Sequence, residues 1–162
     1  MKKTLIIFIV LAILAGGGYY AYTLGFFDQW LPKQHQTDVE GNRIFSDEEI
    51  AKYDQYMKEA HDFVVQGDAG KPDLYKQAIE AYKKATLIGD DKFWNPLLGL
   101  ADSYRKLHEF DKAEEAFNKA LEASSYGVAK IYEEKINMYR YDLKKSDADI
   151  KALYVESIEK VT

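Results

Sequence analysis

Histidine, cysteine and carboxylate side chains are the groups with which this 162-residue sequence could bind a metal or transfer protons. The three histidines, His35, His61 and His108, lie far apart along the chain, and there is no cysteine. Zinc sites combine ligands at short, fixed spacings, and no two of these histidines have such a spacing. The sequence therefore predicts no metal site built on them.

Acidic residues in the segment DVEGNRIFSDEE partly match a calcium-binding loop. Counted from Asp38, the third, fifth and twelfth residues are Glu40, Asn42 and Glu49. Such a loop needs a glycine at its sixth position, where Arg43 stands. We prefer a turn at residues 40–42 followed by the start of a helix at about Asp47, with Ser46 and Glu49 forming a capping box.

Three acidic doublets are the remaining candidates for a general acid and base, namely Asp90-Asp91, Glu114-Glu115 and Glu133-Glu134. Adjacent residues of a helix point apart, so the members of a doublet do not share a site. The sequence contains neither a glycine-rich phosphate loop nor a nucleophile elbow. We therefore expect a protein that is not an enzyme, with no catalytic residue, no cofactor and no bound metal.

The elements that would position any functional side chain are predicted by a repeated pattern. Residues 75–85 read YKQAIEAYKKA, and residues 110–120 read FDKAEEAFNKA. The matching residues are Tyr75, Ala78, Tyr82 and Ala85 in the first copy and Phe110, Ala113, Phe117 and Ala120 in the second. Spacings of three and four place each set on one face of a helix, where alanine lets a neighbouring helix approach and the ring fills the space beside it.

The segment before the second copy supplies a partner helix. Leu97, Leu100, Ala101 and Tyr104 share one face, and His108 and Glu109 form a turn into the second helix. This helix pair resembles a tetratricopeptide repeat (TPR). The family's usual glycine at the turn and proline at the end are replaced by His108 and Ser125.

Two further units flank this repeat. In the first, Tyr56, Ala60 and Phe63 stand at the places of the first helix, and residues 69–74 form an inserted loop before Tyr75. The third unit has Ile131, Tyr132, Lys135, Ile136 and Tyr139 on its first helix. On its second helix, Ala148, Ala152 and Val155 match the small positions of the pattern only with a slip of one residue. The residues Ile150, Leu153, Tyr154 and Ile158 form an apolar stripe on the same helix. We expect its outer face to be a polar cap, with a contact surface as the alternative.

The resemblance implies an all-α fold, an α-solenoid of about three TPR-like helical hairpins over residues 46–162. The predicted units are residues 46–92, 93–126 and 127–162.

The N-terminal region predicts a membrane anchor. Residues 4–27 carry no charge, and about 24 residues at roughly 1.5 Å each exceed a hydrocarbon core of about 30 Å. Lys2 and Lys3 precede this run, so we expect residues 1–27 to form a transmembrane signal-anchor helix with a cytoplasmic N-terminus. Residues 28–45 would be a tether, and the repeats would be extracytoplasmic. The alternative is a signal peptide cleaved at residues 15–17.

The resemblance also implies a groove lined by the first helix of each hairpin, which would bind a protein or peptide partner. Its predicted residues are Asp54, Met57, His61, Asn95, Leu98, Asp102, Arg105, Lys106, Lys130, Glu133, Asn137, Arg140 and Tyr141. The spaced cations with which some TPR proteins hold a terminal carboxylate are not reproduced, since Asp54 stands where a cation would help.

The net charge of -5 argues against nucleic acid as the partner. We therefore expect a membrane-anchored scaffold for a protein partner. The alternative is a structural subunit of an envelope assembly that forms homo-oligomers through anchor and repeats.

Overall fold

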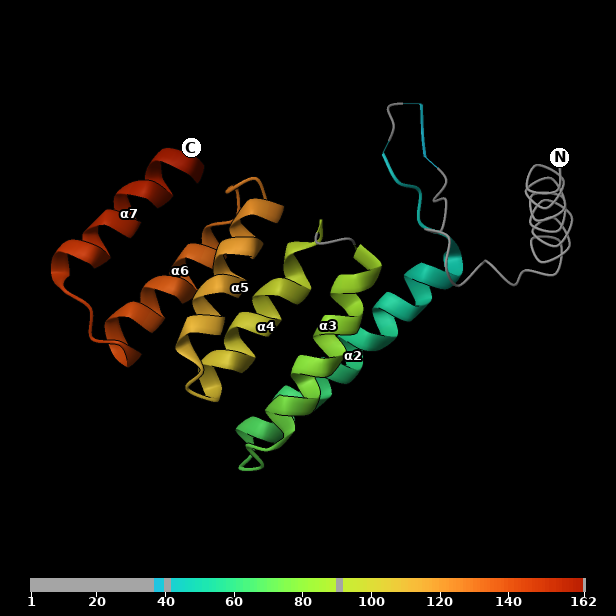
Figure 1. Ribbon diagram of the computed structural model, residues 1–162, viewed down its shortest axis with the longest axis horizontal. Coiled ribbons are helices and arrows are strands. Elements are labelled where there is room, and N and C mark those ends of the chain that lie inside the picture. The colour runs from blue at the N-terminus through green and yellow to red at the C-terminus, as the bar shows by residue number, and fades with distance from the viewer. Residues whose placement is uncertain (1–36, 40–41, 90–91, 162) are drawn as a thin grey trace, which may run out of the picture. The chain divides into compact units, whose positions relative to one another are not determined.

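The computed structural model describes residues 37–39, 42–89 and 92–161 (Figure 1). The chain divides into two compact units, Met1–Phe45 and Ser46–Thr162. The predicted transmembrane segment, residues 4–27, lies outside the described residues. Among the residues that are described, no helix combines the length and the apolar character needed to cross a membrane.

The described part of the first unit is a short turn. Thr37 and Arg43 form an isolated antiparallel bridge, and the Asp38 N–H donates to the Asn42 carbonyl oxygen at 2.8 Å. The Asp38 carboxylate accepts a hydrogen bond from the Asn42 N–H at 2.9 Å. These contacts are those of a turn, in agreement with the interpretation preferred over a calcium loop, although residues 40 and 41 lie outside the described residues.

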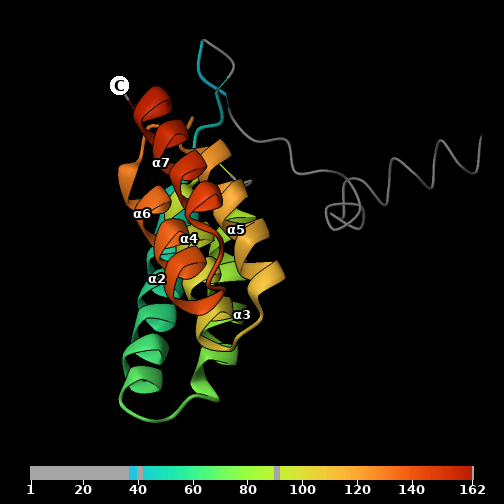
Figure 2. The same ribbon diagram turned by 90° about the vertical axis from the view of Figure 1, so that its left-hand side faces the viewer.

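The second unit is built from helices that pack in chain order (Figure 1). They are α2 (Asp47–Asp68), α3 (Leu74–Gly89), α4 (Trp94–Lys106), α5 (Phe110–Ala123), α6 (Ala129–Asn137), the π-helical turn η1 (Met138–Asp142) and α7 (Asp147–Val161). The described residues contain no β-strand. Three antiparallel hairpins, α2–α3, α4–α5 and α6–α7, stack side by side, and Figure 2 shows α6 and α7 at one end. The predicted all-helical solenoid is confirmed for this unit.

The first helix begins where the sequence predicts. The Glu49 N–H donates to the Ser46 hydroxyl at 3.2 Å, and the Ser46 N–H donates to the Glu49 carboxylate at 2.9 Å. This capping box satisfies two backbone donors at the end of α2 that have no partner within the helix. It also uses the carboxylate that the calcium-loop alternative needed as its twelfth ligand.

The alanine stripes lie at the helix crossings. Ala78, Ala85, Ala113 and Ala120 are completely buried, and Phe117 beside them is as well. Tyr75 and Tyr82 fill the corresponding space on α3, with 6% and 7% of their surface exposed. The prediction that small and large side chains alternate along the packed faces is therefore confirmed.

Gly99 of α4 lies directly against the ring of Tyr82 on α3. A Cβ atom on Gly99 would lie 2.3 Å from the Tyr82 ring, which real Cβ atoms do not do. The ring is almost fully buried and has no free space to move into. Gly99 therefore sets the distance between the first and second hairpins.

Several connections between helices use left-handed backbone without glycine, among them the turns after α4 and α5. His108, at the turn between α4 and α5, has a φ of 59°, and Ser125, after α5, has a φ of 50°. His108 thus adopts the conformation that the glycine of the related family would take more easily. A proline could not replace Ser125 in this structure, because its ring fixes φ near −65°.

The third hairpin differs from the expectation. Ala148 and Ala152 are exposed and Val155 is 45% exposed, so the overlay of small residues on α7 is wrong. Ile150 and Leu153 are buried against α6, while Tyr154 and Ile158 are 42% and 63% exposed. The exposed surface of α7 therefore carries these apolar side chains beside charged ones such as Lys151 and Glu159, and is not the purely polar cap that we expected. Among the described helices, α7 packs mainly on α6 and on Tyr139 of η1, and it is the last helix of the stack.

Substitution of a crossing alanine tests the packing. We expect Ala113→Leu or Ala78→Leu to lower the free energy of unfolding by about 1 to 3 kcal/mol, because three extra carbon atoms must enter a filled crossing. Ala148→Leu is the matched control at an exposed helical position and should change it by less than about 0.5 kcal/mol. Chemical denaturation of the three variants measures the difference. Equal stabilities would contradict the assignment of these crossings.

Candidate functional site

The predicted groove residues lie on α2, α4, α6 and η1. Asp54 and His61 are exposed on α2, and Asn95 is exposed at the start of α4. Met57 on α2 and Leu98 on α4 are half-buried and pack against the core. The first helices of two neighbouring hairpins thus each carry exposed polar side chains and a half-buried apolar one.

Arg105, at the end of α4, is held by three carboxylates. Its Nε donates to Asp142 at 2.5 Å, and its Nη1 lies 3.4 Å from Glu134 and 3.9 Å from Asp102. Its side chain is only 20% exposed. Because Glu134 and Asp142 belong to the third hairpin and Arg105 to the second, this cation joins the two hairpins.

Lys106, also at the end of α4, joins the second hairpin to the first. Its Nζ donates to the Asp68 carboxylate at 2.8 Å, and the Tyr75 hydroxyl donates to the same oxygen at 2.7 Å. These two hydrogen bonds, first that from Lys106, lower the pKa of Asp68, while the Asp68 carboxylate raises the pKa of Lys106. The end of α2 is thereby tied to the end of α4.

Asp102 lies between these two links. Burial raises the pKa of its carboxyl group and outweighs the opposing effect of Lys106 and Arg105. The two cations nearby favour the charged carboxylate and so offset part of the cost of its burial.

The first helix of the third hairpin is anchored by two further hydrogen bonds to α5. Lys135, only 7% exposed, donates to the Asn118 side chain at 2.7 Å, and the Tyr139 hydroxyl donates to Glu114. Burial lowers the pKa of Lys135 and, together with the bond to Glu114, raises the pKa of Tyr139. These bonds fix α6 on the α4–α5 hairpin.

The remaining predicted residues form two separate groups. Lys130 pairs with Glu134 at 2.7 Å and with Glu133 at 3.5 Å along the exposed side of α6. Arg140 is exposed on η1, donates to the Tyr154 hydroxyl at 3.1 Å and lies over the Tyr141 ring. Asn137 lines a pocket between α6 and α7, away from the polar residues of α2. Glu133 lines the same pocket, and Lys130, through Glu134, is connected to Arg105 of α4. Whether the thirteen predicted residues bind one partner stays a prediction.

Sequence reasoning missed the acidic partners Asp68, Glu134 and Asp142. They lie 38, 29 and 37 residues from the cations that they bind, close to the 35-residue interval between repeats. A search for opposite charges separated by about one repeat at the ends of the first helices would have found them. Together with Asp102, Arg105 and Lys106 they form what we call the interhelical charge network.

Within the described ranges, no three metal-ligating side chains lie close enough together to hold a metal ion. The carboxylates of the interhelical charge network instead bind arginine and lysine.

Reversal of the central charge of the network tests its structural role. We expect Arg105→Glu to lower the free energy of unfolding by about 1 to 3 kcal/mol, because it removes the cation shared by three carboxylates and adds a fourth. Arg140→Glu, 35 residues later and exposed, is the matched control and should cost less than about 1 kcal/mol. Thermal and chemical unfolding measure both. If Arg105→Glu changed the free energy of unfolding no more than Arg140→Glu, the structural role of Arg105 would be contradicted.

Comparison with known proteins identifies a family relation for the second hairpin. A search of curated proteins and a search of solved structures gave no significant match. Residues 94–125 match the family model of the tetratricopeptide repeat. This range includes all of α4 and α5, and the model of the family describes such a helical hairpin. The match supports a relation of this chain to the tetratricopeptide-repeat family.

Proposed function

We propose that the chain is a scaffold that binds a protein or peptide partner on the face formed by α2 and α4. The matched repeat supports a role in protein–protein interaction. The location of this partner site is supported by the exposed side chains of Asp54, His61 and Asn95. Within the described part of the chain, these side chains form no hydrogen bond. These side chains are available to a ligand, whereas Arg105 and Lys106 are already paired.

The proposed partner site is smaller than the groove predicted from the sequence and includes only the α2–α4 face. The interhelical charge network holds adjacent first helices in a fixed arrangement, so the surface is rigid before a partner arrives. Met57 and Leu98 supply half-buried apolar surface, and the exposed polar residues of the same helices supply specificity. An extended peptide or a helix lying across α2 and α4 would meet both kinds of surface.

We further propose that residues 4–27 anchor the scaffold in a membrane, with the N-terminus in the cytoplasm and the repeats on the opposite side. The support is the uncharged run of these residues and the two lysines that precede it. Confinement at a membrane would raise the effective concentration of a partner in the same membrane.

Charge substitution on this face tests the proposed partner site. We expect Asp54→Lys with Asn95→Lys to abolish recovery of proteins crosslinked to the full chain in its native membranes, because a complementary partner would meet two new cations. The matched control is Glu80→Lys with Gln77→Lys, which makes the same charge change on the exposed side of α3. Quantitative mass spectrometry compares the two recoveries. Equal loss with the two variants, or no loss with either, would contradict the α2–α4 site.

Extraction experiments test the anchor. We expect the full chain to stay in the membrane pellet at alkaline pH and to have the intact mass of 18.6 kDa. Ile9→Arg with Ile13→Arg should release it, because each buried arginine costs about 2.5 to 3.5 kcal/mol at the centre of a span. Gln34→Arg with His35→Arg, in the predicted tether, is the matched control and should not. A mature chain that lacks its first 15 to 17 residues would favour the signal-peptide alternative.

A further inference from the structure

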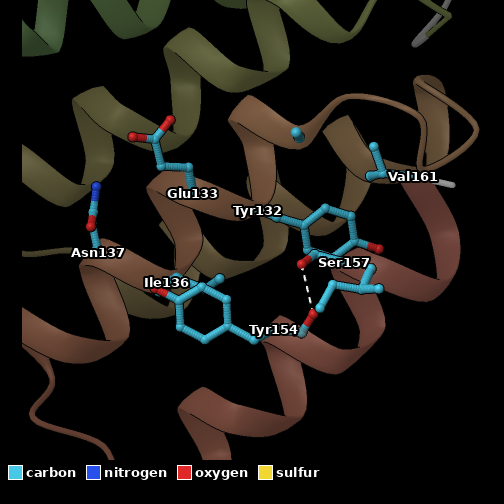
Figure 3. A pocket seen from close by; sticks show the side chains of 9 residues that line it. Tyr132, Glu133, Ile136, Asn137, Tyr154, Ser157 and Val161 are labelled. Atoms are coloured by element: carbon cyan, nitrogen blue, oxygen red, sulfur yellow. Dashed lines mark hydrogen bonds between the residues drawn. The ribbon is translucent and has the colours of Figure 1, made fainter.

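An apolar groove is open between the two helices of the last hairpin. Its volume is about 350 Å³, and the lining is mostly apolar, with Tyr132 and Ile136 from α6 and Tyr154 and Ile158 from α7 (Figure 3). Glu133, which also pairs with Lys130, is the charged residue of this lining, and Arg140 lies outside it. Ile158 is 63% exposed and Tyr154 is 42% exposed. These two side chains therefore expose apolar surface along one groove.

The preceding hairpin shows what kind of element fills such a groove. Helix α6 packs against α5 and places Ile131 and Tyr132 into the same core cluster as Leu97 and Phe117 of the α4–α5 hairpin. In the hairpin before that, α4 packs against α3 in the same manner. The occupant in both cases is an amphipathic helix with a mixed small and large apolar face.

The charges at the groove indicate which helix would fit. In the preceding hairpin, Glu134 of the incoming α6 pairs with Arg105 at 3.4 Å. Arg140 stands 35 residues after Arg105, at the equivalent place in the last hairpin. Its guanidinium donates to the hydroxyl of Tyr154, a residue that lines the groove, so it lies at the groove's edge. A carboxylate on an incoming helix would meet Arg140 as Glu134 meets Arg105.

A second copy of this chain does not offer that carboxylate in the same geometry. The first helix of the next copy would be α2, and Ala60, Ala101 and Ile136 occupy equivalent buried places on α2, α4 and α6. In this register Lys58 of α2 takes the place of Glu134. End-to-end stacking would therefore bring Lys58 towards Arg140, and like charges in contact oppose association.

We propose that the α6–α7 groove binds an amphipathic helix of a partner protein, with its apolar face on Ile158 and Tyr154 and a glutamate or aspartate paired with Arg140. This site is separate from the α2–α4 face and does not depend on the function proposed for it.

A surrogate helix provides the direct test. The probe is a fluorescent, helix-stapled peptide of residues 128–143, the segment that fills the preceding groove, and it is titrated against the full chain in detergent with anisotropy as the readout. We expect saturable binding that Ile158→Glu weakens at least tenfold, because it places a charge in the apolar groove. Val155→Glu, on the same helix but outside the groove lining, is the matched control and should weaken binding less than twofold.

A charge exchange tests the role of Arg140. We expect the probe with Glu134→Lys to bind the natural chain about fivefold more weakly, and the Arg140→Glu chain to recover that loss. Asp54→Lys with Asn95→Lys should leave probe binding unchanged, which separates this site from the α2–α4 face. Thermal unfolding of each variant verifies that it is folded.

Three results would overturn the proposal. The first is the absence of saturable probe binding, and the second is an equal effect of Ile158→Glu and Val155→Glu. The third is self-association of the natural chain in sedimentation that Ile158→Glu abolishes, since it would assign the groove to a second copy.

Discussion

The close approach of neighbouring helices at alanine and glycine positions is the constraint on which the repeat unit depends. Ala78, Ala113 and Ala120 expose no surface, and the rings of Tyr82 and Phe117 fill the space that these small residues leave. A helix pair of this kind cannot bury its apolar face alone, so each hairpin needs the next one. The polar contacts near the helix ends, from Asp68 to Asp142, then fix how adjacent hairpins are rotated and spaced.

Much of the fold followed from periodicity, because a buried stripe on a helix leaves a pattern in the sequence. The capping box at Ser46 and the turn at His108 were placed correctly, and the loop predicted at residues 69–74 ends one residue earlier, since Leu74 begins α3. The register of α7 was not, since Ala148 and Ala152 resemble the crossing alanines while Ile150 and Leu153 occupy the interface. Helix α7 is the last helix of the stack and packs mainly on the helix before it. The sequence therefore did not decide which of its two stripes, the small residues or the apolar ones, is buried. The π-helical turn after α6 had no recognised signal.

The functional surface was predicted less well, because position in a repeat does not reveal which side chains the fold already uses. Arg105 and Lys106 belong to the predicted groove by sequence position, yet their charges join helices within the chain. Their acidic partners lie roughly one repeat away, beyond the reach of local pattern analysis. Asp54, His61 and Asn95 were predicted as groove residues by the same reasoning, and their side chains are exposed. The open α6–α7 groove depends on the register of α7, which only the structure resolved.

The contact between Gly99 and Tyr82 restricts how this protein can diverge. Alanine is the stronger helix former by about 1 kcal/mol, so selection for helix stability alone would replace the glycine. The ring of Tyr82, 2.3 Å from the missing carbon, opposes that change. Either residue could therefore change only if the other changed too, and a pair of coupled substitutions at these two positions is the evolutionary signature to seek in related chains.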